Sequence, residues 1–288
     1  MPKILVTGGA GFVGSNLIEA IVSSGAEACS LDDYSTGREE NHVVGCEYHK
    51  GDVSEEKDLQ VAESVDFIFH LAAKARISRS FEDSAGYFKA NAMGTMDVCR
   101  FALERSIPVV YAGTGSNHGG RYRNPYTFSK AVGEDVVRMS MGLGLKASIA
   151  RFFNVYGPHE STCEDHSTLI GSWRGKAARG EIPVIYGDGT KVRDFTHISD
   201  ITEALMSIMQ KRAFGFEFDL GRGSPLSVLE VAGMFGLGFE FRPDRRGEMQ
   251  ESVCDNSLAR KVLGWNPFRN LKDYVDSEKI RTSPSKNE

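Results

Sequence analysis

The chain lacks an apolar run long enough to cross a membrane, and no charged leader with an apolar signal core opens it. It also lacks an excess of positive charge, because the net charge is −5, so a phosphorylated ligand needs locally placed Arg or Lys side chains. No Cys-x-x-Cys pair occurs among its five scattered cysteines, Cys29, Cys46, Cys99, Cys163 and Cys254. These absences predict a cytoplasmic protein with free thiols that binds neither membranes nor nucleic acid.

What is present fits an ordinary soluble enzyme. The 288 residues are 41% apolar and 25% charged, enough for one large domain or two closely joined ones. Short apolar runs alternate with amphipathic stretches over the first half of the chain, as at 65–73, 88–103 and 108–112. This alternation predicts an α/β fold with a Rossmann-type, doubly wound parallel sheet.

The stretch from Lys3 to Asn16 carries the first sign of a ligand. An apolar run ends in glycines, and a helical pattern begins at Phe12, which is the opening of a dinucleotide-binding βαβ unit. The glycines fit two registers, G-x-G-x-x-G from Gly9 and G-x-x-G-x-x-G from Gly8. In either register the free N–H groups at the helix N-terminus would bind a pyrophosphate.

An acidic residue follows at the expected offset. Asp32 ends the predicted strand 26–31 and lies 18 residues past Gly14, where a carboxylate accepts hydrogen bonds from the adenosine ribose. Because a carboxylate repels a 2′-phosphate, Asp32 favours NAD over NADP. Arg38 could weaken this preference, but we interpret it as a loop residue in solvent.

Three residues indicate acid–base chemistry. Thr114 follows the predicted strand 108–112, and Tyr126 and Lys130 are four residues apart, which places them on one helix face. An ammonium beside a phenol lowers the phenol pKa, so Tyr126 could act as a base near neutral pH. A threonine hydroxyl can orient a substrate hydroxyl.

In this order, these features resemble the extended short-chain dehydrogenase/reductases, in their NAD-dependent epimerase/dehydratase branch. Residues 7–14 resemble the branch pattern T-G-G-x-G-x-x-G, which favours the register of Gly8, Gly11 and Gly14. Thr114, Tyr126 and Lys130 match the catalytic set. The resemblance implies that NAD is bound by Gly8, Gly11, Phe12, Val13, Gly14, Asp32, Asp52, Val53, Leu71, Ala72, Ala73, Asn91, Tyr126 and Lys130.

The second half continues the resemblance. Residues 151–158 resemble R-x-F-N-x-Y-G-P, residues 186–195 resemble Y-G-D-G-x-x-x-R-D-F, and residues 245–248 resemble R-x-G-D/E. The resemblance implies a nucleotide-diphosphate sugar held by Asn154, Leu169, Tyr186, Arg193 and Arg245, with both arginines on the diphosphate. We expect an NAD-binding domain at 1–157, to which 192–212 returns, and a smaller C-terminal α+β substrate domain at 158–288.

The sequence evidence for a metal site is weaker than the evidence for a cofactor site. His159, Cys163 and His166 fall within eight residues, but a fourth ligand is not evident. We expect this segment to be an irregular loop on the substrate side, with no metal.

The reaction implied by the resemblance is nucleotide-sugar 4-epimerisation, with a UDP-sugar favoured. Tyr126 would take the proton of the 4-hydroxyl while hydride passes from C4 to NAD and returns on the opposite face. The branch also contains dehydratases, decarboxylases and keto-sugar epimerases, which carry an Asp-Glu pair, a Glu or a Cys just after the threonine, where this chain has Gly115 and Ser116. A non-catalytic NAD-binding protein is a further alternative, although it predicts loss of Tyr126 or Lys130.

The segment between Thr114 and Tyr126 is much shorter than is usual in the branch. Because that region lines the sugar pocket in the branch, its shortening predicts a more open pocket, suited to a bulkier sugar. The resemblance also implies a homodimer, paired through the helix after strand 65–73 and the helix that carries Tyr126.

Overall fold

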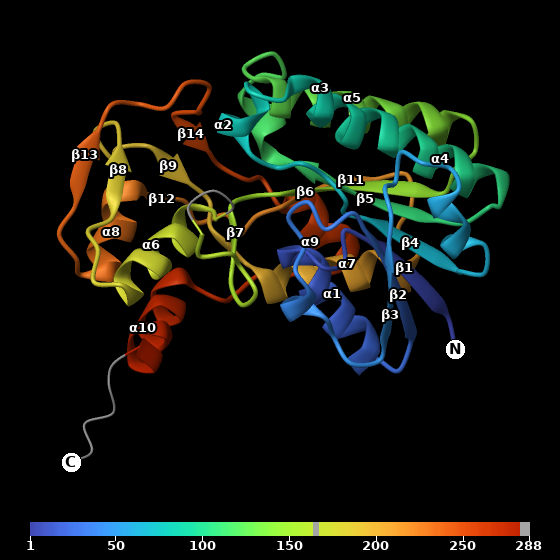
Figure 1. Ribbon diagram of the computed structural model, residues 1–288, viewed down its shortest axis with the longest axis horizontal. Coiled ribbons are helices and arrows are strands. Elements are labelled where there is room, and N and C mark those ends of the chain that lie inside the picture. Colours follow the sequence, from blue (N-terminus) through green and yellow to red (C-terminus); the bar gives the residue numbers. More distant parts are fainter. Residues whose placement is uncertain (164–166, 283–288) are drawn as a thin grey trace.

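A computed structural model describes residues 1–163 and 167–282. Its broad lobe is built around one seven-stranded sheet, and a smaller lobe of short strands and helices lies beside it (Figure 1). Every neighbouring pair in the large sheet is parallel. In spatial order its strands are β11 (Glu217–Leu220), β6 (Ala147–Phe152), β5 (Val109–Thr114), β4 (Phe67–His70), β1 (Lys3–Thr7), β2 (Glu27–Asp32) and β3 (Cys46–Lys50).

The strand order explains where a ligand can bind. The chain builds β1, β2 and β3 outward in one direction and then crosses to β4 on the other side of β1. The carboxyl ends of β1 and β4 therefore lie side by side at a switch point, with Thr7 paired to His70. In open parallel sheets ligands bind in the crevice at such a point.

Helices cover both faces of this sheet (Figure 1). One face packs on α1 (Phe12–Ser23), α7 (Ile198–Lys211) and α9 (Ser257–Leu263), and the other on α4 (Gly94–Glu104) and α5 (Pro125–Gly142). Because both faces are covered, β4 and β5 are buried along their whole length and read as continuous apolar runs. The sheet class predicted from the sequence is confirmed.

The smaller lobe has its own core. Trp173, Ile185, Phe195 and Val231 are almost fully buried there. Its elements are β7 (Val155–Tyr156), α6 (Leu169–Ala178), β8 (Val184–Tyr186), β9 (Val192–Arg193), β10 (Thr196–His197), β12 (Leu226–Ser227), α8 (Val228–Phe235), β13 (Glu240–Arg242), β14 (Glu251–Ser252) and α10 (Leu271–Thr282).

Two elements beyond residue 212 belong to the broad lobe. Strand β11 is the edge strand of the large sheet, and α9 packs against α7 and β11. The division expected from the sequence places both in the second domain at 158–288, whereas strand pairing and packing place them in the first lobe. The short run of β11 gave no sign of which sheet it joins.

The expected long helix over 88–103 is interrupted. Short helices α2 (Ile77–Ser80) and α3 (Ser84–Phe88) come first, then one π-helical turn over Lys89–Met93, and then α4. Helix α5 begins at Pro125, because the Asn124 side chain caps it by accepting the Thr127 N–H at 2.8 Å. Three one-turn 3-10 helices complete the described elements, at Glu39–Asn41, Asp58–Ala62 and Gly115–Gly119. In the part of the chain that the structure describes, no helix is both long and apolar enough to span a membrane.

Candidate active site

A cavity of about 410 Å³ opens at the carboxyl ends of β1, β2 and β4. It is lined by most of the residues that the sequence assigns to NAD: Gly8, Gly11, Phe12, Val13, Gly14, Asp32, Asp52, Val53, Leu71, Ala72 and Ala73. Asn91, Tyr126 and Lys130, the remaining ones, do not line it. They lie on the adjoining turn before α4 and on α5.

The glycine loop fits a pyrophosphate because it keeps side chains out. Gly8 has φ +73°, a conformation that suits glycine, and its N–H donates to the Leu31 carbonyl at 2.8 Å. A Cβ on Gly14 would lie 2.2 Å from the Gly8 carbonyl oxygen. Helix α1 starts directly after this loop, so the N–H groups of its first turn face the cavity at Phe12 to Gly14.

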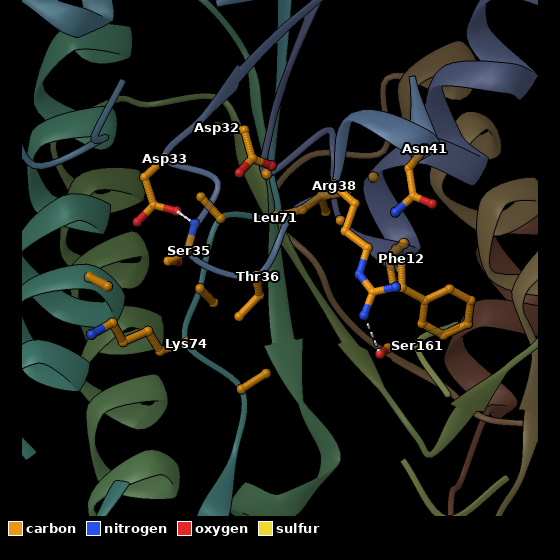
Figure 2. Close-up of a pocket in the computed structure, with 18 of the residues that line it drawn as sticks. Phe12, Asp32, Asp33, Ser35, Thr36, Arg38, Asn41, Leu71, Lys74 and Ser161 are labelled. Atoms are coloured by element: carbon orange, nitrogen blue, oxygen red, sulfur yellow. Dashed lines mark hydrogen bonds between the residues drawn. The ribbon is translucent and has the colours of Figure 1, made fainter. Parts of the chain in front are cut away.

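Asp32 is held in place by backbone N–H groups. Its two carboxylate oxygens accept from Ala10 N at 2.9 Å and Tyr34 N at 2.8 Å, which leaves a second lone pair on each for a ribose hydroxyl. Figure 2 shows Arg38 on the same cavity wall, donating to the Ser161 hydroxyl at 3.1 Å. Arg38 is an exposed loop residue, as we expected, and it also lines the cofactor cavity.

A buried hydrogen-bond chain fixes the floor of this cavity. The Thr7 hydroxyl accepts the N–H groups of Leu71 and Ala72 at 3.2 and 3.1 Å, so its own proton goes to His70 Nδ1 at 2.8 Å. This leaves the proton of His70 on Nε2, where it faces the Thr95 hydroxyl at 3.1 Å. Burial, with a smaller contribution from the Lys130 charge, lowers the pKa of His70 to about 3.

We expect His70 to make the fold sensitive to acid. Its pKa is about 3 in the folded chain and 6.5 in a free side chain, so between these values the unfolded state binds more protons. The free energy of unfolding should therefore decrease as the pH is lowered, and it should decrease fastest below pH 6.5. Urea titrations of wild type and His70→Gln from pH 7.5 to 4 should show their difference shrinking by up to about 1.4 kcal/mol per pH unit. A difference that stays constant would contradict the assignment.

The three catalytic candidates lie between β5 and α5. Thr114 ends β5, and Tyr126 and Lys130 are in the first two turns of α5. The Thr114 side chain lowers the pKa of Tyr126, because a hydroxyl can hydrogen-bond the phenolate. The Lys130 ammonium donates to the Ala112 carbonyl at 2.6 Å and lies 4.1 Å from the centre of the Tyr111 ring. The three residues thus lie at the end of β5 and in the first turns of α5, and their catalytic role stays a prediction.

The expected pKa shift of Tyr126 has the opposite sign. Burial raises the pKa of Tyr126, and the hydrogen bond from Thr114 offsets only part of that rise. Burial also lowers the pKa of Lys130 to about 7. The reason is geometric: the ammonium points to strand β5 at Ala112, so it does not act on the phenol as the helix spacing suggested.

Asn91, on the π-helical turn, helps to position the helix that carries Tyr126 and Lys130. It is fully buried, and its amide accepts the Lys74 N–H at 2.8 Å and donates to the Lys74 carbonyl at 2.9 Å. The same amide donates to the Ser129 hydroxyl at 2.9 Å. Asn91 therefore ties the segment after β4, which lines the cofactor cavity, to the helix that carries Tyr126.

A second cavity of about 260 Å³ lies between the lobes. All the side chains that the resemblance assigns to the sugar nucleotide line it: Asn154, Leu169, Tyr186, Arg193 and Arg245. The Arg245 guanidinium stacks over the Tyr186 ring at 3.6 Å. Arg193 donates to the backbone carbonyls of Met249 at 2.6 Å and Gln250 at 3.1 Å.

Comparison with known proteins agrees with this geometry. A family model described as the NAD dependent epimerase/dehydratase family matches residues 4–221. The chain belongs to this family. Its cofactor is accordingly NAD, and the glycine loop, the helix N-terminus and Asp32 are suited to bind it.

Individual members differ in the reactions that their names state. A putative UDP-glucose 4-epimerase of Methanocaldococcus jannaschii is 28% identical over 94% of this chain and 95% of its own. UDP-glucuronic acid decarboxylase 1 of Arabidopsis thaliana is 29% identical over 94% of this chain and 67% of its own. The UDP-glucose 4-epimerase of Thermotoga maritima, solved with UDP-glucose, has a TM-score of 0.90 at 25% identity, covering 97% of this chain and 99% of that one.

The short segment before Tyr126 packs against a loop of the smaller lobe, and the more open pocket stays a prediction. It forms the 3-10 turn at Gly115–Gly119, and the Met249 side chain packs on Gly119, where an added Cβ would lie 2.5 Å from the methionine Cε and Sδ. Met249 also lines the second cavity. The loop between β13 and β14 thus contacts this segment beside the second cavity.

Asn124 joins this loop to the catalytic helix. Its Oδ1 caps α5, and its Nδ2 donates to the Gly247 carbonyl at 3.1 Å, beside Arg245. Asn124→Asp should keep the cap and lose the second bond, because an aspartate oxygen would face a carbonyl oxygen. We expect KM for the sugar nucleotide to rise about tenfold with little change in melting temperature. Asn124→Ala also loses the cap, so its free energy of unfolding should in addition be lower by about 1 kcal/mol. An unchanged KM in Asn124→Asp would exclude this role.

The sequence did not predict two residues that line the site. Arg76 and Thr168 are common to the linings of both cavities, so they lie where the cofactor and substrate clefts meet. Arg76 comes three residues after the predicted Leu71–Ala73 turn, and continuing that turn along the cofactor could have found it. Thr168 had no such signal, because it lies in a segment without a recognisable pattern.

Glu160 is a third residue of the site that the sequence did not predict. It is 6% exposed, lines the cofactor cavity, and accepts a hydrogen bond from the Thr168 hydroxyl. Burial raises its pKa to about 7.

The segment after Glu160 was considered as a metal cluster. His159 contacts the Ser15 hydroxyl at 2.9 Å, Cys163 is exposed, and His166 lies outside the described residues. Among the residues that the structure describes, no group of three or more His, Cys, Asp or Glu side chains could hold a metal.

Proposed function

We propose that this protein is a nucleotide-sugar 4-epimerase that acts on a UDP-sugar with bound NAD. One observation carries the proposal: Thr114, Tyr126 and Lys130 meet at the end of β5, while the position two residues beyond Thr114 is Ser116, which lines the substrate cavity. The chain thus has a proton acceptor beside the sugar and no carboxylate in the turn where dehydratases and decarboxylases of this branch carry one. The named relatives that act on UDP-glucose support the choice of nucleotide.

In the proposed reaction Tyr126 removes the proton of the sugar 4-hydroxyl, and Thr114 holds the same oxygen by a hydrogen bond. NAD, when bound, supplies the acceptor for the C4 hydride and gives it back. Tyr126 then returns the proton to the oxygen of the inverted carbon, so net redox change and net proton change are both zero.

Lys130 holds the catalytic helix against β5, because its buried ammonium donates to the Ala112 carbonyl at 2.6 Å. Burial lowers its pKa to about 7, so the charge of this site changes near neutral pH. We expect kcat to depend on this ionisation.

Arg193 and Arg245 bind the substrate diphosphate in this proposal. Guanidinium groups suit phosphate oxygens, and both arginines line the second cavity, Arg193 from β9 and Arg245 from the loop before β14. Stacking on Tyr186 fixes the plane of Arg245 before the substrate arrives.

A homodimer in the cytoplasm is part of the proposal. Helices α4 and α5 lie side by side on the outside of the broad lobe, and large apolar side chains on or beside them are exposed: Met93, Tyr122, Met139 and Leu143 (Figure 1). Pairing of this face between two copies would cover them. The five cysteines are all free, which suits a reducing compartment.

The test is product analysis without added reductant. The purified protein with its NAD is incubated with UDP-glucose, UDP-galactose, their N-acetylated forms and the corresponding UDP-uronic acids, and products are identified by proton NMR. Interconversion of a C4 pair supports the proposal. A 4-keto-6-deoxy sugar, or a pentose with release of carbon dioxide, would show a dehydratase or a decarboxylase instead.

A further inference from the structure

The 3-10 turn at Gly115–Gly119 connects the proposed catalytic threonine to the substrate cavity. It begins directly after Thr114, and Ser116 on this turn lines that cavity. The Ser116 N–H donates to the Thr114 hydroxyl oxygen at 3.2 Å, so the turn also limits the directions in which this hydroxyl can donate its proton. A shift of the turn would therefore move a part of the cavity lining and the threonine hydroxyl together.

Two side chains of this turn bond to acids on different elements. The Asn117 amide donates to Glu134 on α5 at 2.7 Å. The His118 Nε2 lies 2.9 Å from a carboxylate oxygen of Asp219 on β11, the edge strand of the large sheet. The His118 ring also stacks on the buried ring of Phe153, with 5.9 Å between the ring centres. The turn is thus held at two points, and at one of them the partner of the acid is a histidine, whose charge changes near neutral pH.

Both acids belong to one cluster of ion pairs. Its members are four acids and three arginines: Glu134, Asp135, Glu217, Asp219, Arg121, Arg138 and Arg151. Arg151 joins the two acids that hold the turn, at 2.8 Å from Glu134 and 3.3 Å from Asp219. Because the acids outnumber the arginines by one, a protonated His118 completes the charge balance of the cluster.

The surroundings of His118 favour its charged form. The bond to Asp219 raises the pKa of His118 above its ordinary value of 6.5, and Glu134 adds to this rise, whereas partial burial and Arg151 oppose it. Strand β14 packs against the turn as well, and its titratable side chain, Glu251, is exposed. Below that pKa the contact with Asp219 is an ion pair. Above it the ring is neutral and only an uncharged donor remains, so the turn is held less firmly as the pH rises.

We propose that His118 is a positioning residue, whose ion pair with Asp219 fixes the turn that lines the substrate cavity. Through the Ser116 N–H, this turn keeps the Thr114 hydroxyl directed at the sugar oxygen. His118 does not line the substrate cavity, so it acts through the turn and not on the sugar itself. The inference rests on the proposed function in giving Thr114 a part in the reaction. It predicts that the reaction is faster when His118 is charged.

The test is the pH dependence of turnover in His118 variants, measured with the sugar nucleotide that the enzyme converts. Values of kcat and KM are determined from pH 5.5 to 9 for wild type, His118→Gln, His118→Arg and His49→Gln. Glutamine removes the charge, whereas arginine keeps it at every pH and can still stack on Phe153. His49 is the matched control, because it lies 3.2 Å from Glu47 on the opposite edge strand of the sheet and lines neither cavity.

At pH 6 we expect kcat of His118→Gln to be about tenfold below wild type, with the same NAD content. The difference should shrink to about twofold at pH 9, because wild-type His118 is then neutral as well. His118→Arg should match wild type at pH 6 and exceed it at pH 9. The ionisation of Lys130, whose pKa is about 7, is common to all variants and cancels in these ratios.

A His118→Gln enzyme that equals His49→Gln at every pH would overturn the proposal. A loss of the same size at every pH would overturn it too, because a merely structural role gives that result. If His118→Gln does not fold, His118→Arg decides alone, and a pH profile identical to wild type would contradict the inference. Failure of the epimerase proposal is separate: a dehydratase or decarboxylase with the predicted pH dependence would contradict that function and leave this inference standing, whereas a protein that converts no sugar nucleotide would contradict both.

Discussion

Tyr126→Phe is expected to lower kcat by about 10²- to 10⁴-fold while NAD stays bound. The change removes one hydroxyl, the group that takes the proton of the sugar 4-hydroxyl, and leaves the ring that packs against Tyr87. Because Tyr126 does not line the cofactor cavity, NAD content after purification should match wild type. Steady-state rates and the absorbance of released cofactor measure the two quantities.

Tyr122→Phe is the matched control. Tyr122 lies four residues earlier and is 80% exposed, so losing its hydroxyl should leave kcat within about twofold of wild type. If Tyr126→Phe kept more than about a tenth of the wild-type rate, Tyr126 would not be the base, and a group beside the substrate cavity such as Ser116 would have to be considered.

Gly14→Ala is expected to remove NAD binding. A Cβ at this position would lie 2.2 Å from the Gly8 carbonyl oxygen and 2.7 Å from the Gly9 Cα. Both contacts are with backbone, which cannot rotate away, so the loop must move off the helix N-terminus that should bind the pyrophosphate. We expect NAD affinity to fall by at least about tenfold and stability by about 1–3 kcal/mol. Titration of the stripped protein with NAD and thermal unfolding check the two effects.

Gly233→Ala is the control for this change. Gly233 lies inside α8 of the smaller lobe, and an added Cβ would meet no atom within 4 Å. Alanine there should raise stability by about 0.5–1 kcal/mol through helix propensity and leave NAD affinity unchanged. If Gly14→Ala bound NAD as well as Gly233→Ala, the glycine loop would not be the pyrophosphate site.

Local patterns were enough to predict the cofactor half of the site. The glycines after β1 and the acid after β2 are each fixed by a short stretch of chain, because a strand, a tight turn and a helix follow one another directly. Parallel pairing then brings their ends to the same edge of the sheet, as Thr7 and His70 show. The positions of Gly8, Gly14 and Asp32 in one cavity could be predicted for that reason.

What the sequence could not predict depends on contacts between distant segments. The direction of the Lys130 ammonium is set by the Ala112 carbonyl on a strand eighteen residues earlier, and this reversed the expected pKa shift of Tyr126. The position of the short segment before Tyr126 depends on its contact with Met249, which lies more than a hundred residues later. Arg76 belongs to no sequence motif, and it is recognised as a site residue only because it lines both cavities in the structure.

In the proposed reaction one hydride leaves C4 of the sugar and returns to the same carbon, and Tyr126 takes and returns the proton. The most direct measurement uses the sugar nucleotide that the enzyme converts, labelled with deuterium at C4, in ordinary water without added reductant. We expect the C4 epimer to keep its deuterium at C4 over many turnovers, as seen by NMR and mass spectrometry. An epimer that has exchanged this deuterium for solvent hydrogen would contradict it.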